Sequence, residues 1–289
     1  MPSPKRLPKN LKLELPLLAE EVRSFLSTRR ARLTPAEAGV SAGFGTRRVP
    51  GLRRDELAAA ADISVEYYSK LEQGRIHNPS LSTLASVARA LKLNQSENHY
   101  LHLLFRKDEP GAESGSRGAR VALRALVHAL TDMPAFLMDQ KLDIVVLNQP
   151  AETLIFGKPS LKPMNLARSI FSDPRSRSRY VDWREKAEDT VAILRFARAK
   201  FPYDEAIPEL IDELRYSGAA FRHIWAKHGV LEKKNGQRRL YDSKGGIVDT
   251  YYETMTFPAD PHLTLVIYLP KTDTPVSSAV NGDRNLLVP

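Results

Sequence analysis

The sequence predicts a multidomain α and α+β protein, in which an all-α domain is followed by an α+β domain with an antiparallel sheet. Three observations predict this. The chain has 289 residues, which exceeds the length of one average domain. Apolar residues recur at helical spacing as far as Phe105, whereas the end of the chain shows strand patterns. Between these regions, DEPGAESGSRG combines Gly, Ser, Pro and charge, which is typical of a flexible linker. We therefore place the domains at 15–107 and 119–270, the linker at 108–118 and a loose tail at 271–289.

The first region begins with a basic, proline-interrupted stretch, MPSPKRLPKNLKLELPLL, which indicates a floppy arm rather than a secretory signal. Leu18, Val22 and Phe25 then follow one face of a helix. The same spacing recurs in the series Leu84, Val87, Ala88 and Leu91, and again in Leu101, Leu104 and Phe105. This half of the chain is therefore expected to be a compact helical domain.

Residues 52–91 read LRRDELAAAADISVEYYSKLEQGRIHNPSLSTLASVARAL and predict two helices that meet at a tight turn. The first helix would bury Leu57, Ala58 and Ala61, and the small alanines there allow the next helix to cross closely. Asp62-Ile63-Ser64 supplies the turn. Ser64 is placed to cap the second helix and Gly74 to end it, while Tyr68 and Leu71 face inward.

The second region predicts a helix over about 119–131 and then a hairpin in PAFLMDQKLDIVVLNQP, around Gln140-Lys141. Helical patterns follow at 180–200, at 204–217 and around 219–228. The chain then returns to strands in RRLYDS, IVDTYYETMTF and LTLVIYLP. Strands, helices and strands in this order favour an α+β domain with one antiparallel sheet.

Composition and charge narrow the class of protein. The chain has no cysteine, which excludes disulfides, thiolate zinc sites and cysteine nucleophiles. No apolar run approaches the roughly 18 residues of a membrane span, so we expect a cytoplasmic protein that does not enter a membrane. Residues 1–107 hold 18 Lys and Arg against 10 Asp and Glu, whereas residues 108–289 hold 25 against 24. This imbalance suggests a nucleic-acid-binding module joined to a neutral partner, although a soluble surface that happens to be basic remains an alternative.

One combination of motifs is specific. It consists, in order, of ELA, a small-residue turn, S-V-x-Y-Y-x-x-L-E-Q-G and N-P-S-L. It closely resembles the lambda-repressor-like helix-turn-helix domain of the phage repressors and of their bacterial relatives, the xenobiotic-response-element (XRE) family. The resemblance implies binding to double-stranded DNA. A plain helical hairpin without a DNA role is the alternative that apolar spacing alone would allow.

The resemblance also implies roles for individual residues. Val65 would contact a thymine methyl, Glu66 would accept a hydrogen bond from a cytosine amino group, and Lys70 would reach guanine, on the helix that begins after Ser64. Arg54, Tyr67 and Arg75 would contact backbone phosphates. Upstream, GFGTRRVPGLRRDEL places four arginines around a Pro-Gly turn, where they would grip phosphate or the minor groove, unless the loop is only solvated: Arg47, Arg48, Arg53 and Arg54.

RRVPGLRR and YYSKLEQG together resemble one subgroup, the MmyB-like regulators, and the resemblance runs from about residue 15 to residue 270. Its later stretches are PAFLMDQKLDIVVLN, NLARSIFSDPRSRSRYVDWREKAEDTVAILR, SGAAFRHIWAKHGV and LTLVIYLP. The resemblance implies a PAS-like domain that encloses a small apolar ligand such as a fatty acid, with no other cofactor. This chain departs from the subgroup at Met164, where an arginine is usual, so an anion-anchoring role for that position is in doubt.

Candidate ligand-binding residues fall into two sets. Six aromatic residues would line the pocket, or else form plain core: Phe136, Phe171, Trp183, Phe221, Trp225 and Tyr252. Three polar residues would anchor a head group: Asn148, Arg222 and His228. His228, near a helix end, is equally well explained as a structural histidine.

The sequence therefore predicts a sequence-specific transcription regulator, and we expect a homodimer that reads two half-sites about one helical turn apart. We predict no enzymatic activity, because the chain has no Gly-rich phosphate loop, no HExxH and no nucleophile elbow. His223 and His228 also lack the one-turn spacing of a helical zinc pair. Two alternatives for the C-terminal domain stay open, a protein-interaction module and an uncharted enzyme.

Overall fold

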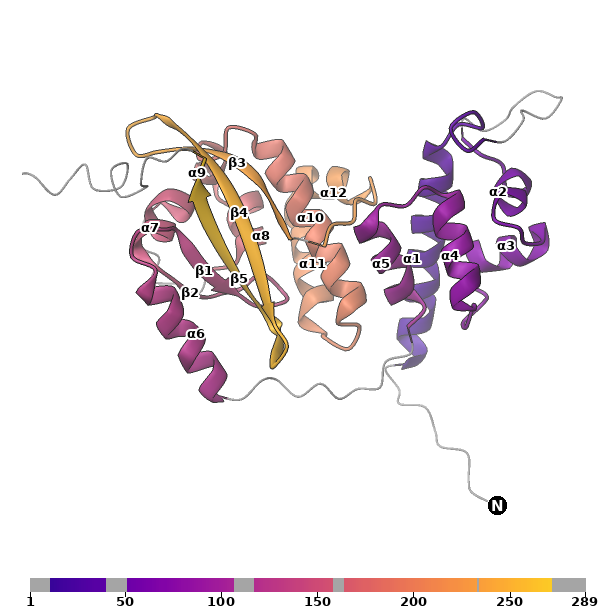
Figure 1. Cartoon of the computed structure of the whole chain (residues 1–289), viewed down its shortest axis with the longest axis horizontal. Coiled ribbons are helices and arrows are strands. Elements are labelled where there is room, and N and C mark those ends of the chain that lie inside the picture. Colours follow the sequence, from indigo (N-terminus) through magenta and orange to yellow (C-terminus); the bar gives the residue numbers. More distant parts are fainter. Residues whose placement is uncertain (1–10, 40–50, 107–116, 158–163, 233, 272–289) are drawn as a thin grey trace, which may run out of the picture. The chain divides into compact units, whose positions relative to one another are not determined.

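The computed structural model of the chain describes residues 11–39, 51–106, 117–157, 164–232 and 234–271. The chain divides into two compact units, Met1–Glu109 and Pro110–Pro289 (Figure 1). Most of the predicted linker and nearly all of the predicted tail lie outside the described residues. The last two residues of the predicted linker already belong to a helix of the second unit, which begins at Arg117.

The described part of the first unit is helical, as predicted. Its elements are α1 (Leu11–Arg32), α2 (Arg54–Ala60), α3 (Val65–Glu72), α4 (Leu81–Ala90) and α5 (Gln95–Leu104). The expectation of a floppy arm over residues 1–18 was wrong for its last eight residues, because α1 begins at Leu11. A proline removes one backbone hydrogen bond to the residue four positions before it, and the 22-residue α1 continues past Pro16 in spite of that loss.

The turn between α2 and α3 has the predicted construction. Leu57, Ala58 and Ala61 are buried, so α3 crosses close to α2. Asp62 takes a left-handed conformation, with φ of 55°, which Asp tolerates better than most residues. Ser64 caps α3, since its Oγ accepts a hydrogen bond from the backbone N–H of Tyr67 at 3.1 Å. These contacts fix the direction in which α3 leaves the turn.

The second unit contains one five-stranded sheet with helices on both faces (Figure 1). Its helices are α6 (Arg117–Ala129), α7 (Gln149–Ala151), the π-helix η1 (Glu152–Phe156), α8 (Leu166–Ser172), α9 (Pro174–Arg177), α10 (Trp183–Lys200), α11 (Ala206–Ser217) and α12 (Ala219–Trp225). Its strands are β1 (Ala135–Met138), β2 (Ile144–Leu147), β3 (Asn235–Tyr241), β4 (Ile247–Phe257) and β5 (Asp260–Pro270). The strand order is β2-β1-β5-β4-β3 and every pair is antiparallel, which confirms the predicted sheet class.

The two faces of the sheet pack against different helices. Successive residues of a strand point to opposite faces. Accordingly, Leu137 and Leu265 pack with Val127 of α6, whereas Phe136 and Val266 belong to a larger core that α8, α10, α11 and α12 cover. The larger core lies between the sheet and the helices that the sequence places between β2 and β3.

Candidate nucleic-acid interface

Helix α3 has one buried and one accessible side. Tyr68, Leu71 and Glu72 are buried. The other five residues of α3 are accessible and form what we call the recognition face: Val65, Glu66, Tyr67, Ser69 and Lys70. Val65 is 46% exposed although it is apolar, and Glu66 and Lys70 are also exposed, while Tyr67 and Ser69 are half-buried. An accessible apolar side chain between polar ones is suited to contact with base edges in a major groove.

Two of the residues predicted to read bases pair with each other. Lys70 Nζ lies 2.7 Å from Glu66 Oε1, one helical turn away, and the side chains are 53% and 79% exposed. The hydrogen bond and positive charge of Lys70 lower the pKa of Glu66, which is therefore ionised at neutral pH. Exposed pairs of this kind contribute little to stability, because water screens the two charges. Both side chains can therefore leave the pair at small cost.

The buried side of α3 carries a charged group that the sequence analysis did not identify. Glu72 is fully buried and accepts hydrogen bonds from Arg30 Nε at 2.8 Å, from Arg54 Nε at 2.9 Å and from the Tyr68 hydroxyl at 2.8 Å. Burial by itself raises the pKa of a carboxyl, but the bonds from Arg30, Tyr68 and Arg54 bring the pKa of Glu72 below its ordinary value. We call these four residues the Glu72 cluster.

The Glu72 cluster joins three helices. Arg30 comes from α1 and also donates from Nη1 to the backbone carbonyl of Leu52 at 2.7 Å. Arg54 comes from the first turn of α2, and Glu72 from the last turn of α3. The cluster therefore fixes the buried side of α3 to α1 and α2. A sequence signal existed, since Glu72 follows Tyr68 by four residues and so falls on the inward side of the helix.

The other predicted phosphate contacts have different positions. Arg54 has a 47% exposed side chain and forms an ion pair with Glu72, so it already has an intramolecular partner. Arg53 precedes α2 and is half-buried, and its backbone N–H donates to the Glu56 carboxylate. Arg75 is exposed just beyond α3. Arg47 and Arg48 lie outside the described residues.

The six aromatic residues predicted for ligand binding come together in the larger core of the second unit. Four are buried and two are partly buried: Phe136, Phe221, Trp225 and Tyr252, then Phe171 and Trp183. The Phe171 ring meets Phe221 edge-on at 5.1 Å and Trp183 at 6.2 Å, while Phe221 stacks on Trp225 at 5.7 Å. We call these six residues the aromatic cluster.

The three polar residues predicted to anchor a head group do not come together. Asn148 is buried, and its amide makes four hydrogen bonds to the backbone, accepting from Ala135 and Ala151 and donating to Leu130 and Met133. These four bonds occupy the full hydrogen-bonding capacity of an amide side chain. Asn148 is therefore occupied in joining β2, α7 and the segment before β1.

Arg222 lies on α12, and His228 lies in the turn that follows it, where its backbone N–H donates to the Trp225 carbonyl at 3.2 Å. Arg222 is exposed on α12 and donates to the carbonyls of Arg215 and Tyr216 at the end of α11. His228 is half-buried in a left-handed turn, with φ of 51°. Met164, which stands where the subgroup has arginine, packs against the larger core as an apolar side chain.

The larger core also contains cations that sequence analysis missed. Lys186, Arg195 and Arg238 are all at most 5% exposed. Arg238 pairs with Glu185 at 2.8 Å and with Asp189, and the charge of Asp189 raises its pKa above the ordinary value in spite of burial. Lys186 and Arg195 lie on α10, over the rings of Tyr180 and Trp225.

Comparison with known families agrees with this division. The family model described as the MmyB-like transcription regulator ligand binding domain matches residues 119–281, more than half of the chain. The chain belongs to this family. A helix-turn-helix family model matches residues 50–94 of the regulator, which include α2, α3 and α4. The regulator thus carries a helix-turn-helix domain followed by an MmyB-like ligand-binding domain.

A curated protein is similar to part of the regulator. It is the HTH-type transcriptional regulator DdrOP3 of Deinococcus deserti, 57% identical over 42 residues, which are 14% of this chain and 32% of the relative. The regulator thus matches about a third of that relative's length. Within the described residues, no helix of the regulator combines the length and apolar character needed to cross a membrane.

Proposed function

We propose that the regulator binds a specific duplex sequence through the recognition face of α3, as a homodimer on two half-sites about one helical turn apart. The observation that carries this proposal is the construction of α3. One side is accessible and carries apolar, acidic and basic groups, while the other is fixed by the Glu72 cluster. A rigid helix with a chemically mixed outer face is what discrimination between base edges requires.

In this proposal the residues of and near the recognition face have different roles in DNA binding. Lys70 donates to guanine, Glu66 accepts from a cytosine amino group and Val65 contacts a thymine methyl. Tyr67 and Arg75 contact phosphates and so set register without reading sequence. Because Glu66 and Lys70 are paired in the free protein, base contact replaces an existing ion pair, and discrimination rests on the difference between the two arrangements.

The DNA proposal is tested by selecting bound duplexes from a random library with the full chain, followed by binding measurements on Lys70→Ala. We expect an enriched, two-fold symmetric sequence. Lys70→Ala should reduce the preference for that sequence over random duplex by about 5- to 150-fold, corresponding to roughly 1–3 kcal/mol. Arg89→Ala is the matched control, because Arg89 is an exposed cation of the same domain on α4.

Two outcomes would contradict the proposal. One is a selection that enriches no sequence. The other is a Lys70→Ala variant that keeps the discrimination of the Arg89→Ala control. The homodimer is tested separately by sedimentation of the regulator with and without the selected duplex, and a single protomer on a full site would refute it.

We further propose that the C-terminal domain binds a small apolar ligand, a fatty acid, against the aromatic cluster. The family match supports a ligand-binding role in general, and the gathering of aromatic rings between sheet and helices supports an apolar ligand. Binding changes DNA affinity only if the ligand favours one arrangement of the DNA-binding domains over another.

The chain is well suited to test this ligand. It has two tryptophans, Trp183 and Trp225, and both belong to the aromatic cluster. Titration with saturated fatty acids of increasing length should therefore change the intrinsic tryptophan emission and, in the same samples, the affinity for the selected duplex. Mass spectrometry of lipid extracted from the purified protein identifies a resident ligand. Unchanged emission and unchanged DNA affinity at saturating fatty acid would refute the ligand proposal and leave DNA binding intact.

A further inference from the structure

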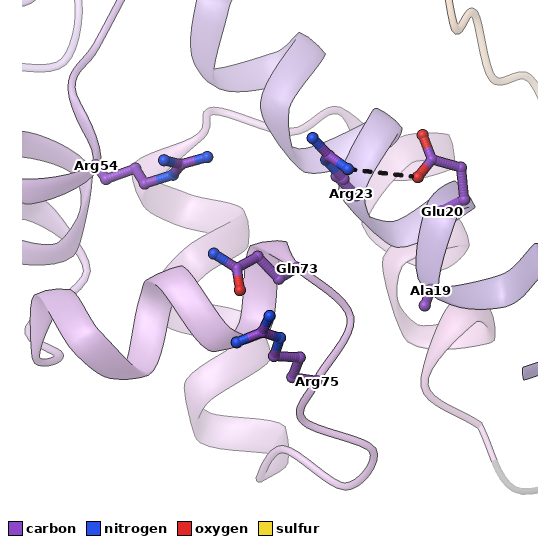
Figure 2. Close-up of a pocket in the computed structure, with 6 residues that line it drawn as sticks. All are labelled: Ala19, Glu20, Arg23, Arg54, Gln73 and Arg75. Carbon is purple, nitrogen blue, oxygen red and sulfur yellow. Dashed lines mark ion pairs between the residues drawn. The ribbon is translucent and has the colours of Figure 1, made fainter. Parts of the chain in front are cut away.

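A hollow of about 310 Å³ lies beside the end of α3, lined by residues of α1, of α2 and of the turn that follows α3. Its lining is Ala19, Glu20, Arg23, Arg54, Gln73 and Arg75, and we call it the arginine cup (Figure 2). The lining contains three guanidinium groups, one amide and one carboxylate. The cup is therefore cationic and rich in hydrogen-bond donors.

Two small residues create the cup. Gly74 ends α3 with φ of +67°, and a Cβ at this position would lie 2.6 Å from the Cα of Ala19. The turn after α3 therefore lies directly against α1, at a point where neither residue has a long side chain. This close approach brings Gln73 and Arg75, on either side of the glycine, next to the exposed face of α1 that carries Arg23.

The three arginines differ in how firmly they are held. Glu72 bonds to Nε and Nη2 of Arg54, which leaves Nη1 outside that ion pair, and the side chain is 47% exposed. The Arg23 side chain is 64% exposed. Its Nη1 lies 3.8 Å from Glu20 Oε2, which is a long distance for an ion pair. Figure 2 shows Arg54 and Arg23 extending toward the cup from opposite sides. A fixed guanidinium thus faces a movable one.

The cup continues the recognition face. Glu66, Lys70 and Gln73 are spaced by four and three residues, so they follow one line along α3, and Gln73 lines the cup. When a duplex lies along this line, its sugar-phosphate backbone passes next to the cup. Guanidinium groups bind phosphate oxygens in paired hydrogen bonds, and an amide adds a further donor.

We propose that the arginine cup holds a phosphate group of bound DNA, so that α1 takes part in the interface through Arg23. Glu20 then competes with the phosphate for Arg23 and lowers the affinity. This inference rests on the proposed DNA binding and extends it to Arg23, Gln73 and Glu20. The same chemistry would also suit free inorganic phosphate, and the experiment distinguishes the two sources.

The experiment measures the affinity of the full chain for the selected duplex at several salt concentrations. Arg23→Gln should weaken binding about 5- to 20-fold and reduce the slope of log affinity against log salt by about one, because one phosphate contact is lost. Glu20→Gln should strengthen binding about 2-fold, since Arg23 loses its competing partner. Arg89→Gln removes the same charge from α4, away from the cup, and should leave the slope unchanged.

The outcomes are separable. If Arg23→Gln and Arg89→Gln weaken binding equally with equal slopes, only overall charge matters and the cup is not a contact. If Glu20→Gln weakens binding, the competing role is wrong. If the unchanged protein binds no duplex, the proposed function itself fails. Thermal melts of each variant verify the fold, and Arg23 is exposed enough for its replacement to be tolerated.

A second arm uses inorganic phosphate at constant ionic strength, with the melting temperature as readout. The proposal expects the DNA defect of Arg23→Gln to persist in phosphate-free buffer. A variant that binds DNA normally but loses a phosphate-induced rise in melting temperature would overturn the assignment to DNA and identify free phosphate as the ligand.

Discussion

In the N-terminal domain a buried carboxylate is enclosed by cationic side chains, whereas in the C-terminal domain a buried guanidinium is met by carboxylates nearer the surface. Glu72 has a side chain 1% exposed, and its cationic partners Arg30 and Arg54 are 13% and 47% exposed. Arg238 has a side chain 4% exposed, but its partners Asp189 and Glu185 are 25% and 62% exposed. The two sites therefore differ in how far the partners can return to water.

This difference teaches how each domain uses charge. If Glu72 is replaced, the charge of Arg30 stays behind on a side chain that is only 13% exposed, where water screens it poorly. The Glu72 cluster thus holds α1, α2 and α3 as one unit. Around Arg238 the carboxylates of α10 lie nearer solvent, so that pairing tolerates disturbance. We expect the first site to behave as a rigid support and the second as an adjustable contact.

The largest effect is expected for Glu72→Gln. The amide retains the shape but removes the charge, which leaves Arg30 buried without its counter-ion. The free energy of unfolding of the N-terminal domain should fall by about 3 kcal/mol, within the range found when one partner of a buried pair is removed. Thermal melts followed by circular dichroism measure the loss of helix, while tryptophan emission follows the C-terminal domain, where both tryptophans lie.

Glu66→Gln is the control for that measurement, since it makes the same change on an exposed part of the same helix. Its effect on the free energy of unfolding should be far smaller than that of Glu72→Gln, because Glu66 is exposed. A Glu72→Gln protein as stable as Glu66→Gln would mean that the enclosed carboxylate does not support the helices.

A smaller effect is expected for Arg238→Met, which keeps much of the side-chain volume and removes the charge. Asp189 and Glu185 can then turn further toward water, so the unfolding free energy of the C-terminal domain should fall by only about 1–2 kcal/mol. Chemical denaturation followed by tryptophan emission gives this value. Arg239→Met, on the neighbouring exposed position, is the control. A loss above that of Glu72→Gln would reverse the comparison.

The smallest change in stability is expected at Asp139. This partly buried carboxylate accepts hydrogen bonds from the backbone N–H groups of Lys141 and Asp143. Burial raises its pKa to about 6 from an ordinary 3.8. The folded protein therefore holds this proton more tightly than the unfolded chain, and the contribution of Asp139 to stability declines as pH rises from about 4 to 6.

Asp139→Asn keeps the carbonyl acceptor and removes the charge, so it should be more stable than the unchanged protein above pH 6. The advantage should shrink as the pH falls from 6 toward 4. Denaturation at a series of pH values measures the difference between the two proteins. An advantage that grows at lower pH would show that the bonds from Lys141 and Asp143 outweigh burial.

Much of the fold was predictable from the sequence, because it depends on local patterns. The helix-turn-helix follows from small residues at the crossing, a serine cap and a glycine end, and β4 coincides with IVDTYYETMTF. Helices α7, η1 and α9 were not predicted, because elements of three to five residues are too short to show a period.

The candidate sites were predictable only in part. Ion pairs between residues far apart in the chain produce no periodic pattern in the sequence. The recognition face was identified from its position on one helix. The partners of Arg54 and of Arg238 were not, since Glu72 and Asp189 lie 18 and 49 residues away along the chain. The sequence predicted that Asn148 would anchor a ligand head group. In the structure its side-chain amide makes four hydrogen bonds to backbone groups instead.

The position of β5 has a consequence for synthesis of the chain. Among the described strands it is the last in sequence but the middle one of the sheet, and it joins the β1–β2 hairpin to the β3–β4 hairpin. Neither hairpin has its central neighbour until residues 260–270 have left the ribosome, whereas the described helices of the first unit end at residue 104. The helical unit can therefore fold earlier in translation than the sheet of the second unit, which needs residues 260–270.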